Sequence, residues 1–178
     1  MKDFSVRSSK KIYSGPVFNL FKEEVVLPND QVVERDVVRH PGAVVILPLA
    51  EDQSVYFVRQ YRHAIGRSIL ELPAGTLETG ELALDCAKRE ISEEVGFAAN
   101  SWHDLGQIFT APGFCDETQY TFLATDLYPR KLPGDEDEIL EIESYPFSEV
   151  PELIKRSEIV DAKSIAVFYK AYISGMIV

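Results

Sequence analysis

Cysteine and basic residues are both scarce in this chain of 178 residues. Its two cysteines, Cys86 and Cys115, are too few and too far apart for a disulfide scaffold or a zinc knuckle, so we expect reduced thiols and a cytoplasmic location. Eighteen Lys and Arg stand against 29 Asp and Glu, and the formal net charge is −11. Because phosphate backbones attract cationic surfaces, this deficit argues against a nucleic-acid partner.

Long apolar runs are also missing. The longest, residues 43–50, is interrupted by Pro48 and falls far short of the roughly 20 residues that a bilayer-spanning helix needs. The first five residues turn polar at once, which does not match a secretory signal. We therefore expect no membrane partner. The length of the chain suits a single buried core.

The most informative segment is residues 75–97, which read GTLETGELALDCAKREISEEVGF. If residues 82–95 are helical at about 100° per residue, Glu93 lies roughly 60° to one side of Glu90 and Glu94 roughly 40° to the other. Like charges this close repel one another, so a cation is expected among them, and a divalent ion with oxygen ligands fits best. The acids are expected to look outward, while an apolar stripe faces the core: Leu84, Ala87, Ile91 and Val95.

Two glycines bracket this helix, Gly75 at an expected tight turn and Gly96 as the expected terminator. The segment resembles the signature of the Nudix family at all nine specified positions: Gly75, Glu81, Arg89, Glu90, Ile91, Glu93, Glu94, Gly96 and Phe97. This resemblance implies a hydrolase that needs Mg²⁺, with Mn²⁺ as a substitute. It implies that Glu90, Glu93 and Glu94 bind the metal, together with the backbone carbonyl of Ala74.

Arg89 stands four residues before Glu93 and is expected to hold that carboxylate by an ion pair, or else to be an ordinary surface arginine. Glu81 has an alternative explanation, because acids in a first helical turn also suit the helix dipole. The catalytic base of similar enzymes is a glutamate on a loop before a late strand. Glu138 fits that position best here, with Glu136 as the substitute, although a solvated acidic loop explains both equally.

Upstream of the acids, Arg59 and Arg62 share a predicted strand and point to opposite faces, so the two cannot have the same role. One of them is expected to face a phosphate or the terminal ribose of a substrate, the alternative being a strand-end arginine in solvent. Glu71 is expected either to bind metal or to hold an arginine. This region resembles the ADP-ribose pyrophosphatase branch of the family.

Pro112 lies fifteen residues after Phe97 and resembles a marker for ADP-ribose hydrolysis in that branch. Pro112 and Gly113 are therefore expected to shape the sugar end of the pocket, although Pro-Gly alone indicates only a turn. Phe18, or else Phe21, is expected to stack on adenine, and core packing explains either equally well.

The strand pattern begins with a predicted hairpin, residues 17–27 and 31–39, across a turn at Pro28-Asn29-Asp30, after a possible first strand at residues 4–13. Residues 43–49 are nearly all apolar and are expected to pair centrally with residues 55–61. Further predicted elements are strands at residues 102–109, 119–128 and 139–147, a short helix from Ser148, and a last helix capped by Asp161 with apolar positions Ile165, Phe168, Tyr169, Tyr172 and Ile173.

This order predicts an α+β fold, an α/β/α sandwich. The resemblance implies the Nudix fold, a mixed sheet between helices, for residues 42–178. It implies that residues 1–41 are an N-terminal β-strand extension that supports a homodimer.

The function that these expectations favour is metal-dependent hydrolysis of ADP-ribose, or of a similar nucleoside diphosphate sugar, to a nucleoside monophosphate and a sugar phosphate. Hydrolysis of GDP-mannose or of dinucleoside polyphosphates stays open as an alternative. A different class of function, a non-catalytic sensor that binds ADP-ribose, is disfavoured because every signature acid is present.

Overall fold

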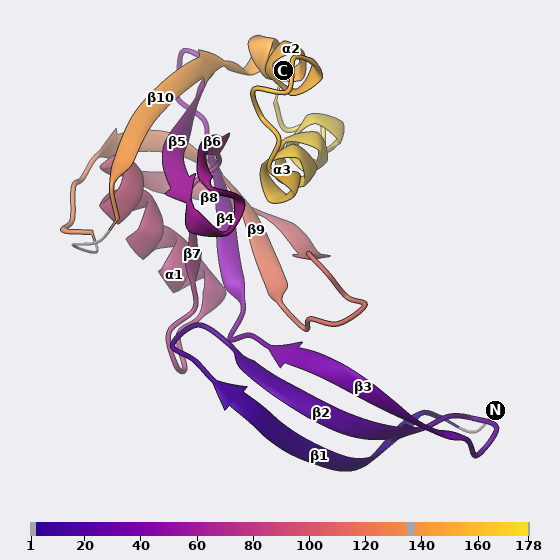
Figure 1. Cartoon of the computed structure of the whole chain (residues 1–178). Helices are drawn as coiled ribbons and strands as arrows, with labels where there is room; N and C mark the ends of the chain where they lie inside the picture. Colours follow the sequence, from indigo (N-terminus) through magenta and orange to yellow (C-terminus); the bar gives the residue numbers. More distant parts are fainter. Residues whose placement is uncertain (1–2, 135–137, 178) are drawn as a thin grey trace. The chain divides into compact units, whose positions relative to one another are not determined.

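The computed structural model describes residues 3–134 and 138–177 (Figure 1). Internal contacts divide the chain into two compact units: Met1–Gly42 with Phe109–Thr118, and Ala43–Ile108 with Gln119–Val178. Among the described residues, none of the helices has the length and apolar character to span a membrane.

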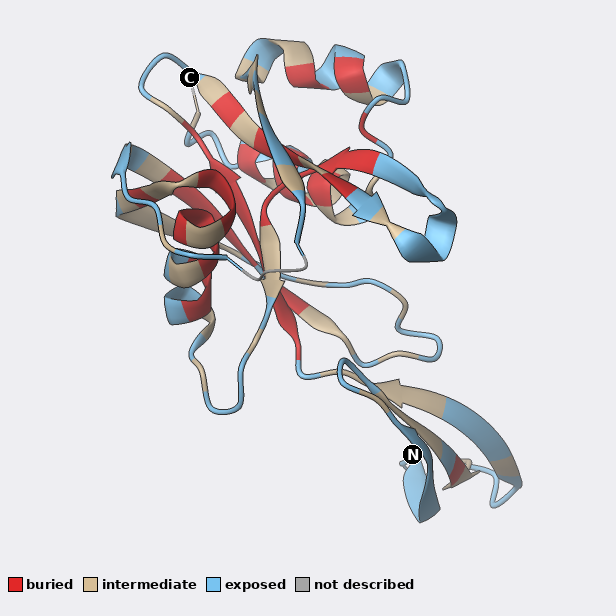
Figure 2. Ribbon diagram, turned by 60° about the vertical axis from the view of Figure 1, so that its left-hand side comes forward, coloured by how far each residue is buried: buried red, intermediate tan, exposed pale blue. Residues whose placement is uncertain are grey.

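The first unit is built on a three-stranded antiparallel sheet in the order β1-β2-β3, from β1 (Ser5–Ser14), β2 (Asn19–Val26) and β3 (Val32–Arg39). The predicted hairpin is confirmed, because Leu27 N donates to Gln31 O at 2.8 Å and Asp30 takes a φ of 65°. The strand at residues 4–13 is also present, as β1, and every one of its residues is exposed (Figure 2).

Residues 109–118 complete this unit by docking on β3. Val38 N donates to Phe114 O at 2.7 Å, and Asp116 N donates back to Val38 O at 3.1 Å. Arg39 adds an ion pair with Asp116 at 3.1 Å. The loop that carries Pro112 and Gly113 is therefore held by the N-terminal strands.

The second unit contains two sheets. One has the order β7-β4-β9-β8 and the other β10-β5-β6. Their strands are β4 (Ala43–Pro48), β5 (Ser54–Arg62), β6 (Arg67–Glu71), β7 (Ala74–Thr76), β8 (Phe97–Phe109), β9 (Thr118–Pro129) and β10 (Leu140–Pro146). The four-stranded sheet is mixed, since β4 runs parallel to β9 and antiparallel to β7.

The predicted pairing of residues 43–49 with residues 55–61 is wrong. Strands β4 and β5 belong to different sheets, and the isolated bridge near them joins Leu49, just after β4, to Val55. The reason is that β9 and β7 occupy both edges of β4, while β5 takes its sequence neighbour β6 and the distant β10.

The helices are α1 (Ala83–Glu90), α2 (Val150–Lys155) and α3 (Ala162–Ile173), and α1 and α3 lie on opposite sides of β4 (Figure 1). Alternate residues of β4 supply two cores. Val44 and Ile46 pack on the α1 side, whereas Val45 and Leu47 pack on the α3 side. All four side chains are fully buried, and each contributes about 1.5–3 kcal/mol of apolar burial. The predicted α/β/α sandwich is confirmed.

The predicted cap of α3 is confirmed, because the Asp161 carboxylate accepts from Ser164 N at 2.9 Å. The predicted apolar stripe of α3 is only partly correct. Phe168 is buried, but Tyr169 and Tyr172 are each 59% exposed. The buried face instead uses the small side chains Ser164, Val167 and Ala171, which allow the helix to lie close to the sheet.

Candidate active site

The predicted acidic helix consists of two parts. The α-helix α1 ends at Glu90, and a π-helical turn follows over Ile91–Val95. Nothing in the sequence indicated this widened turn, a feature that is frequent at functional sites. Gly96 ends the turn as predicted, with a left-handed φ of 79° and its N–H bonded to Ile91 O.

The π-helical turn is held by residues 130–132. Arg130 N donates to Gly96 O at 2.9 Å and Leu132 N to Ser92 O at 3.0 Å. Lys131 Nζ donates to Glu93 O at 2.6 Å. These bonds satisfy carbonyl groups of the turn and place a cation beside the acids, a role for Lys131 that the sequence did not indicate.

The prediction that the acids look outward is wrong for two of them. Glu90 is 8% exposed and Glu94 is 4% exposed, because β7 covers them. In the predicted apolar stripe, Leu84 is 36% exposed, and the neighbouring Cys86 is buried instead. The acids thus belong to the interior of the unit, where a charge is costly unless it is compensated.

Gly75 permits this burial. A Cβ atom at this position would lie 1.8 Å from Glu90 Oε1 and 1.9 Å from Glu90 Cδ. The backbone of β7 therefore approaches the carboxylate more closely than any side chain allows. Gly75 does not have a positive φ, so the need for glycine here arises from space and not from the tight turn that we expected.

The guanidinium of Arg89 lies among the acids and pairs with three of them. Its Nη1 donates to Glu90 Oε1 at 2.6 Å and to Glu93 Oε2 at 2.9 Å. Its Nε and Nη2 both reach the Glu81 carboxylate at 3.0 Å. The expected Arg89–Glu93 ion pair is present, and Glu81 orients the arginine through a two-pronged pair.

Hydrogen bonding to Arg89 lowers the pKa of the Glu81 carboxyl to about 2. Burial acts in the opposite direction on Glu90 and Glu94: it raises the pKa of Glu90 to about 7 and that of Glu94 well above its ordinary value. Glu94 accepts a hydrogen bond from Ala74 N at 3.0 Å, and Arg89 makes no bond to it. Glu94 is thus the acid most in need of a further cation or a proton.

Glu138 lies beside Glu93 and Glu94. Its carboxylate accepts from Gln60 Nε2 at 3.3 Å, and it borders a hollow of about 180 Å³ lined by Glu93, Glu94, Lys131, Gly134, Glu138, Leu140 and Ile142. The structure therefore brings Glu138 to the acids of the π-helical turn. Glu136, the other candidate base, lies outside the described residues. Gln60 was not predicted as a site residue.

The two arginines of β5 have different carboxylate partners. Arg59 pairs with Glu143 on β10 at 2.5 Å, and Tyr145 donates to the same carboxylate. Arg62 Nε donates to Glu71 Oε1 at 2.6 Å. Glu71 is 1% exposed and also contacts Lys163. Of the two roles considered for Glu71, the structure shows it holding an arginine.

The remaining predicted residues belong to the first unit. Pro112 and Gly113 line a hollow of about 510 Å³ together with Arg35, Asp36, Val37, Arg39, Phe109, Phe114, Cys115, Asp116 and Thr118. Phe18 is 40% exposed, and its ring centroid lies 5.8 Å from that of Tyr13. Phe21 lies under Lys11, with 5.5 Å from Nζ to the ring centroid. Their contacts with a substrate stay predictions.

A NUDIX domain model matches residues 38–168 of the chain. The chain belongs to the Nudix family. An ADP-ribose pyrophosphatase of Bacillus subtilis is 37% identical over 88% of this chain and 86% of its own length. Another, from Mycobacterium tuberculosis, is 39% identical over 92% of this chain and 81% of its own length.

A solved structure described as an ADP compounds hydrolase superposes with a TM-score of 0.84, covering 98% of this chain and 95% of that one at 24% identity. This likeness confirms the Nudix fold. Family membership and these relatives identify the chain as a Nudix hydrolase.

The residues of this Nudix hydrolase fit a divalent cation. Within the described part of the chain, no three His, Cys, Asp or Glu side chains are arranged to hold a metal as they stand, because Glu90 and Glu93 are turned towards Arg89. The buried, uncompensated Glu94 nevertheless lies beside Glu90, and both supply the oxygen donors that Mg²⁺ and Mn²⁺ prefer. Ala74, whose carbonyl is the predicted further donor, contacts Glu94 through its amide.

Proposed function

We propose that this Nudix hydrolase uses Mg²⁺, or Mn²⁺ in its place, to hydrolyse ADP-ribose to AMP and ribose 5-phosphate. The observation that carries the proposal is the pair of buried acids, Glu90 and Glu94, beside the backbone of β7: Glu90 is bonded to Arg89, and Glu94 is bonded to no cation among the described residues. The names of the Bacillus and Mycobacterium relatives support ADP-ribose as the substrate.

Bound to Glu90, Glu93, Glu94 and the Ala74 carbonyl, a divalent ion would supply charge neutralisation for the diphosphate and a more acidic water. Arg89 has a positioning role, since it holds Glu90 and Glu93 in one orientation while Glu81 holds the arginine. The terminal nitrogens of Arg62 can donate to a phosphate oxygen, because Glu71 accepts from the Nε of Arg62 alone.

The proposed step transfers one phosphoryl group to water. A water oxygen forms a bond to one phosphorus, the bond from that phosphorus to the bridging oxygen breaks, and its electron pair leaves with the bridging oxygen. The proton of the water passes to Glu138, whose carboxylate Gln60 holds beside Glu93 and Glu94. Glu136 is the substitute for this base.

Turnover of a substrate panel tests the proposal. With Mg²⁺ present, we expect ADP-ribose to give the highest kcat/KM among ADP-ribose, ADP-glucose, GDP-mannose and diadenosine polyphosphates, and chelation of the metal to stop the reaction. The measurement is phosphate release after coupling to a phosphatase. A preference for GDP-mannose or for a dinucleoside polyphosphate would establish one of the alternatives instead. Tight binding of ADP-ribose without turnover would establish the sensor.

We also propose that residues 1–41 mediate a homodimer. Every residue of β1 is exposed, including the apolar side chains Val6 and Ile12, and a three-stranded sheet needs a covered apolar face to be stable. Light scattering should give twice the chain mass of 20.1 kDa, and the double variant Val6→Glu, Ile12→Glu should give the single mass. A single mass for the unaltered protein would refute the dimer.

A further inference from the structure

Glu71 is a buried carboxylate with two cations, one on each oxygen. Arg62 Nε donates to its Oε1 at 2.6 Å, and Lys163 Nζ contacts its Oε2. Lys163 comes from the first turn of α3 and is itself only 11% exposed. It also lies 3.0 Å from the Asp161 carboxylate. Glu71 thus joins the last helix of the chain to the arginine of β5.

Arg62 points to the same face of β5 as Gln60, which stands two residues earlier and donates to Glu138 at 3.3 Å. The Arg62 side chain is 41% exposed. Among the described residues, its Nη1 and Nη2 have no acceptor, since Glu71 engages Nε alone. The forked end of the guanidinium is therefore open to an anion that approaches the acids.

Carboxylate and guanidinium prefer to pair through two parallel hydrogen bonds. Arg62 and Glu71 do not do so here, because Lys163 occupies the second oxygen of the carboxylate. Without Lys163, Glu71 would be left buried with a single cation, and a second bond from Arg62 would be the nearest compensation. Such a bond would take one terminal nitrogen of Arg62 away from any ligand.

We propose that Lys163 is a positioning residue for substrate binding: by occupying Glu71 Oε2, it keeps the terminal nitrogens of Arg62 free for a phosphate oxygen of the diphosphate. That this phosphate belongs to the substrate rests on the proposed function. Lys163 does not touch the substrate, and its effect passes through Glu71 and Arg62.

Contacts other than the Lys163–Glu71 pair also anchor α3. Asp161 caps the helix by accepting from Ser164 N at 2.9 Å, and Ser164 Oγ accepts from Leu72 N at 2.7 Å. A variant at position 163 therefore retains the contacts that dock the helix, which separates a positioning role from a merely structural one.

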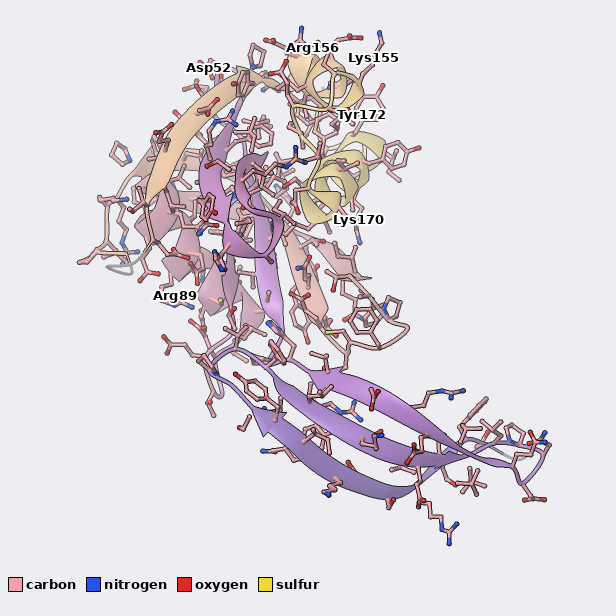
Figure 3. All side chains as sticks on the ribbon, viewed as in Figure 1. Asp52, Arg89, Lys155, Arg156, Lys170 and Tyr172 are labelled. Carbon is pink, nitrogen blue, oxygen red and sulfur yellow. The ribbon has the colours of Figure 1, made fainter. Side chains whose placement is uncertain are left out.

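Lys163→Met should raise KM for ADP-ribose about tenfold, the worth of one charge-assisted hydrogen bond, while kcat changes by less than about threefold. Lys163→Arg should restore much of the loss. The matched control is Lys170→Met on the same helix (Figure 3), since the bond that Lys170 makes among the described residues is to the carbonyl of Gln107. An unchanged KM in Lys163→Met, or equal losses in Lys163→Met and Lys170→Met, would overturn the proposal.

A second measurement does not require turnover. The Nε–H signal of Arg62 in a ¹H–¹⁵N spectrum, assigned with Arg62→Lys, reports its bond to Glu71, and a titration with inorganic pyrophosphate in EDTA reports an anion at the guanidinium. We expect Lys163→Met to shift this signal and to weaken pyrophosphate binding about tenfold. Pyrophosphate binding that is equal in both proteins would overturn the role of Lys163, whatever the substrate panel shows. Absence of turnover by the unaltered protein would refute only the proposed function.

Discussion

Glu94→Gln should lower kcat roughly a thousandfold while making the metal-free protein more stable at pH 8. The loss of activity is expected because a charged ligand of the proposed metal is removed, which forfeits several kcal/mol of charge stabilisation. Steady-state turnover of ADP-ribose with Mg²⁺ measures this effect. Asp85→Asn on α1 is the matched control, since Asp85 is exposed and its one ion pair within the described part of the chain is with Lys88.

The gain in stability follows from the pKa of Glu94, which burial raises well above its ordinary value. A carboxyl whose pKa is raised on folding binds more protons in the folded state, so the folded protein loses stability as the pH rises from the ordinary value of 4.5 through the raised value. Glutamine carries no charge to bury. The thermal midpoint of Glu94→Gln should therefore exceed that of the unaltered protein at pH 8 in EDTA, with the difference vanishing below pH 4.5.

Mg²⁺ should raise the midpoint of the unaltered protein and leave that of Glu94→Gln nearly unchanged, because a ligand stabilises only the state that binds it. Full activity in Glu94→Gln would contradict the metal role. A lower midpoint at pH 8 would contradict the claim that its charge is uncompensated.

Gly75→Ala should cost about 1–3 kcal/mol of stability and roughly a hundredfold in kcat. The added methyl group cannot share space with Glu90 Oε1, 1.8 Å away, so either β7 or the carboxylate must shift. A shift of β7 moves Ala74, which precedes Gly75 and whose amide donates to Glu94. A shift of the carboxylate moves Glu90. Each movement therefore displaces a proposed metal ligand. Denaturant unfolding and steady-state turnover measure the two effects.

The double variant Gly75→Ala, Glu90→Ala separates packing from chemistry. Removing the Glu90 side chain removes the clash, so stability should return towards that of Glu90→Ala alone while activity stays lost. Gly134→Ala is the control for stability alone, since its Cβ would lie 3.5 Å from Glu93 O, an ordinary contact, while Gly134 itself lines the hollow beside the acids. Gly75→Ala with unaltered turnover would show that the close approach of β7 has no catalytic importance.

Local chemistry in the sequence predicted those features that depend on few neighbouring residues. The turn at Asp30, the Asp161 cap and the Gly96 terminator each follow from one residue and its immediate backbone. The spacing of three and four residues likewise predicted that Glu90, Glu93 and Glu94 lie together on one helix. The Arg89–Glu93 ion pair follows from the same spacing.

Partners that are distant in the sequence were not predictable in this way. The apolar pattern of β4 shows that both of its faces are buried, but not that β9 and β7 would take both of its edges. The burial of Glu90 and Glu94 depends on β7, which the pattern of α1 does not encode. Lys163 lies 92 residues from Glu71, and no local pattern marks either as a partner of the other.

The most direct test of the account is the anomalous diffraction of Mn²⁺ in crystals grown with ADP-ribose. We predict a Mn²⁺ peak bonded to the carboxylates of Glu90 and Glu94, with the diphosphate beside it and within reach of Arg62. A peak elsewhere, with these carboxylates still turned to Arg89 and Ala74, would contradict the claim that the buried acids hold the catalytic metal.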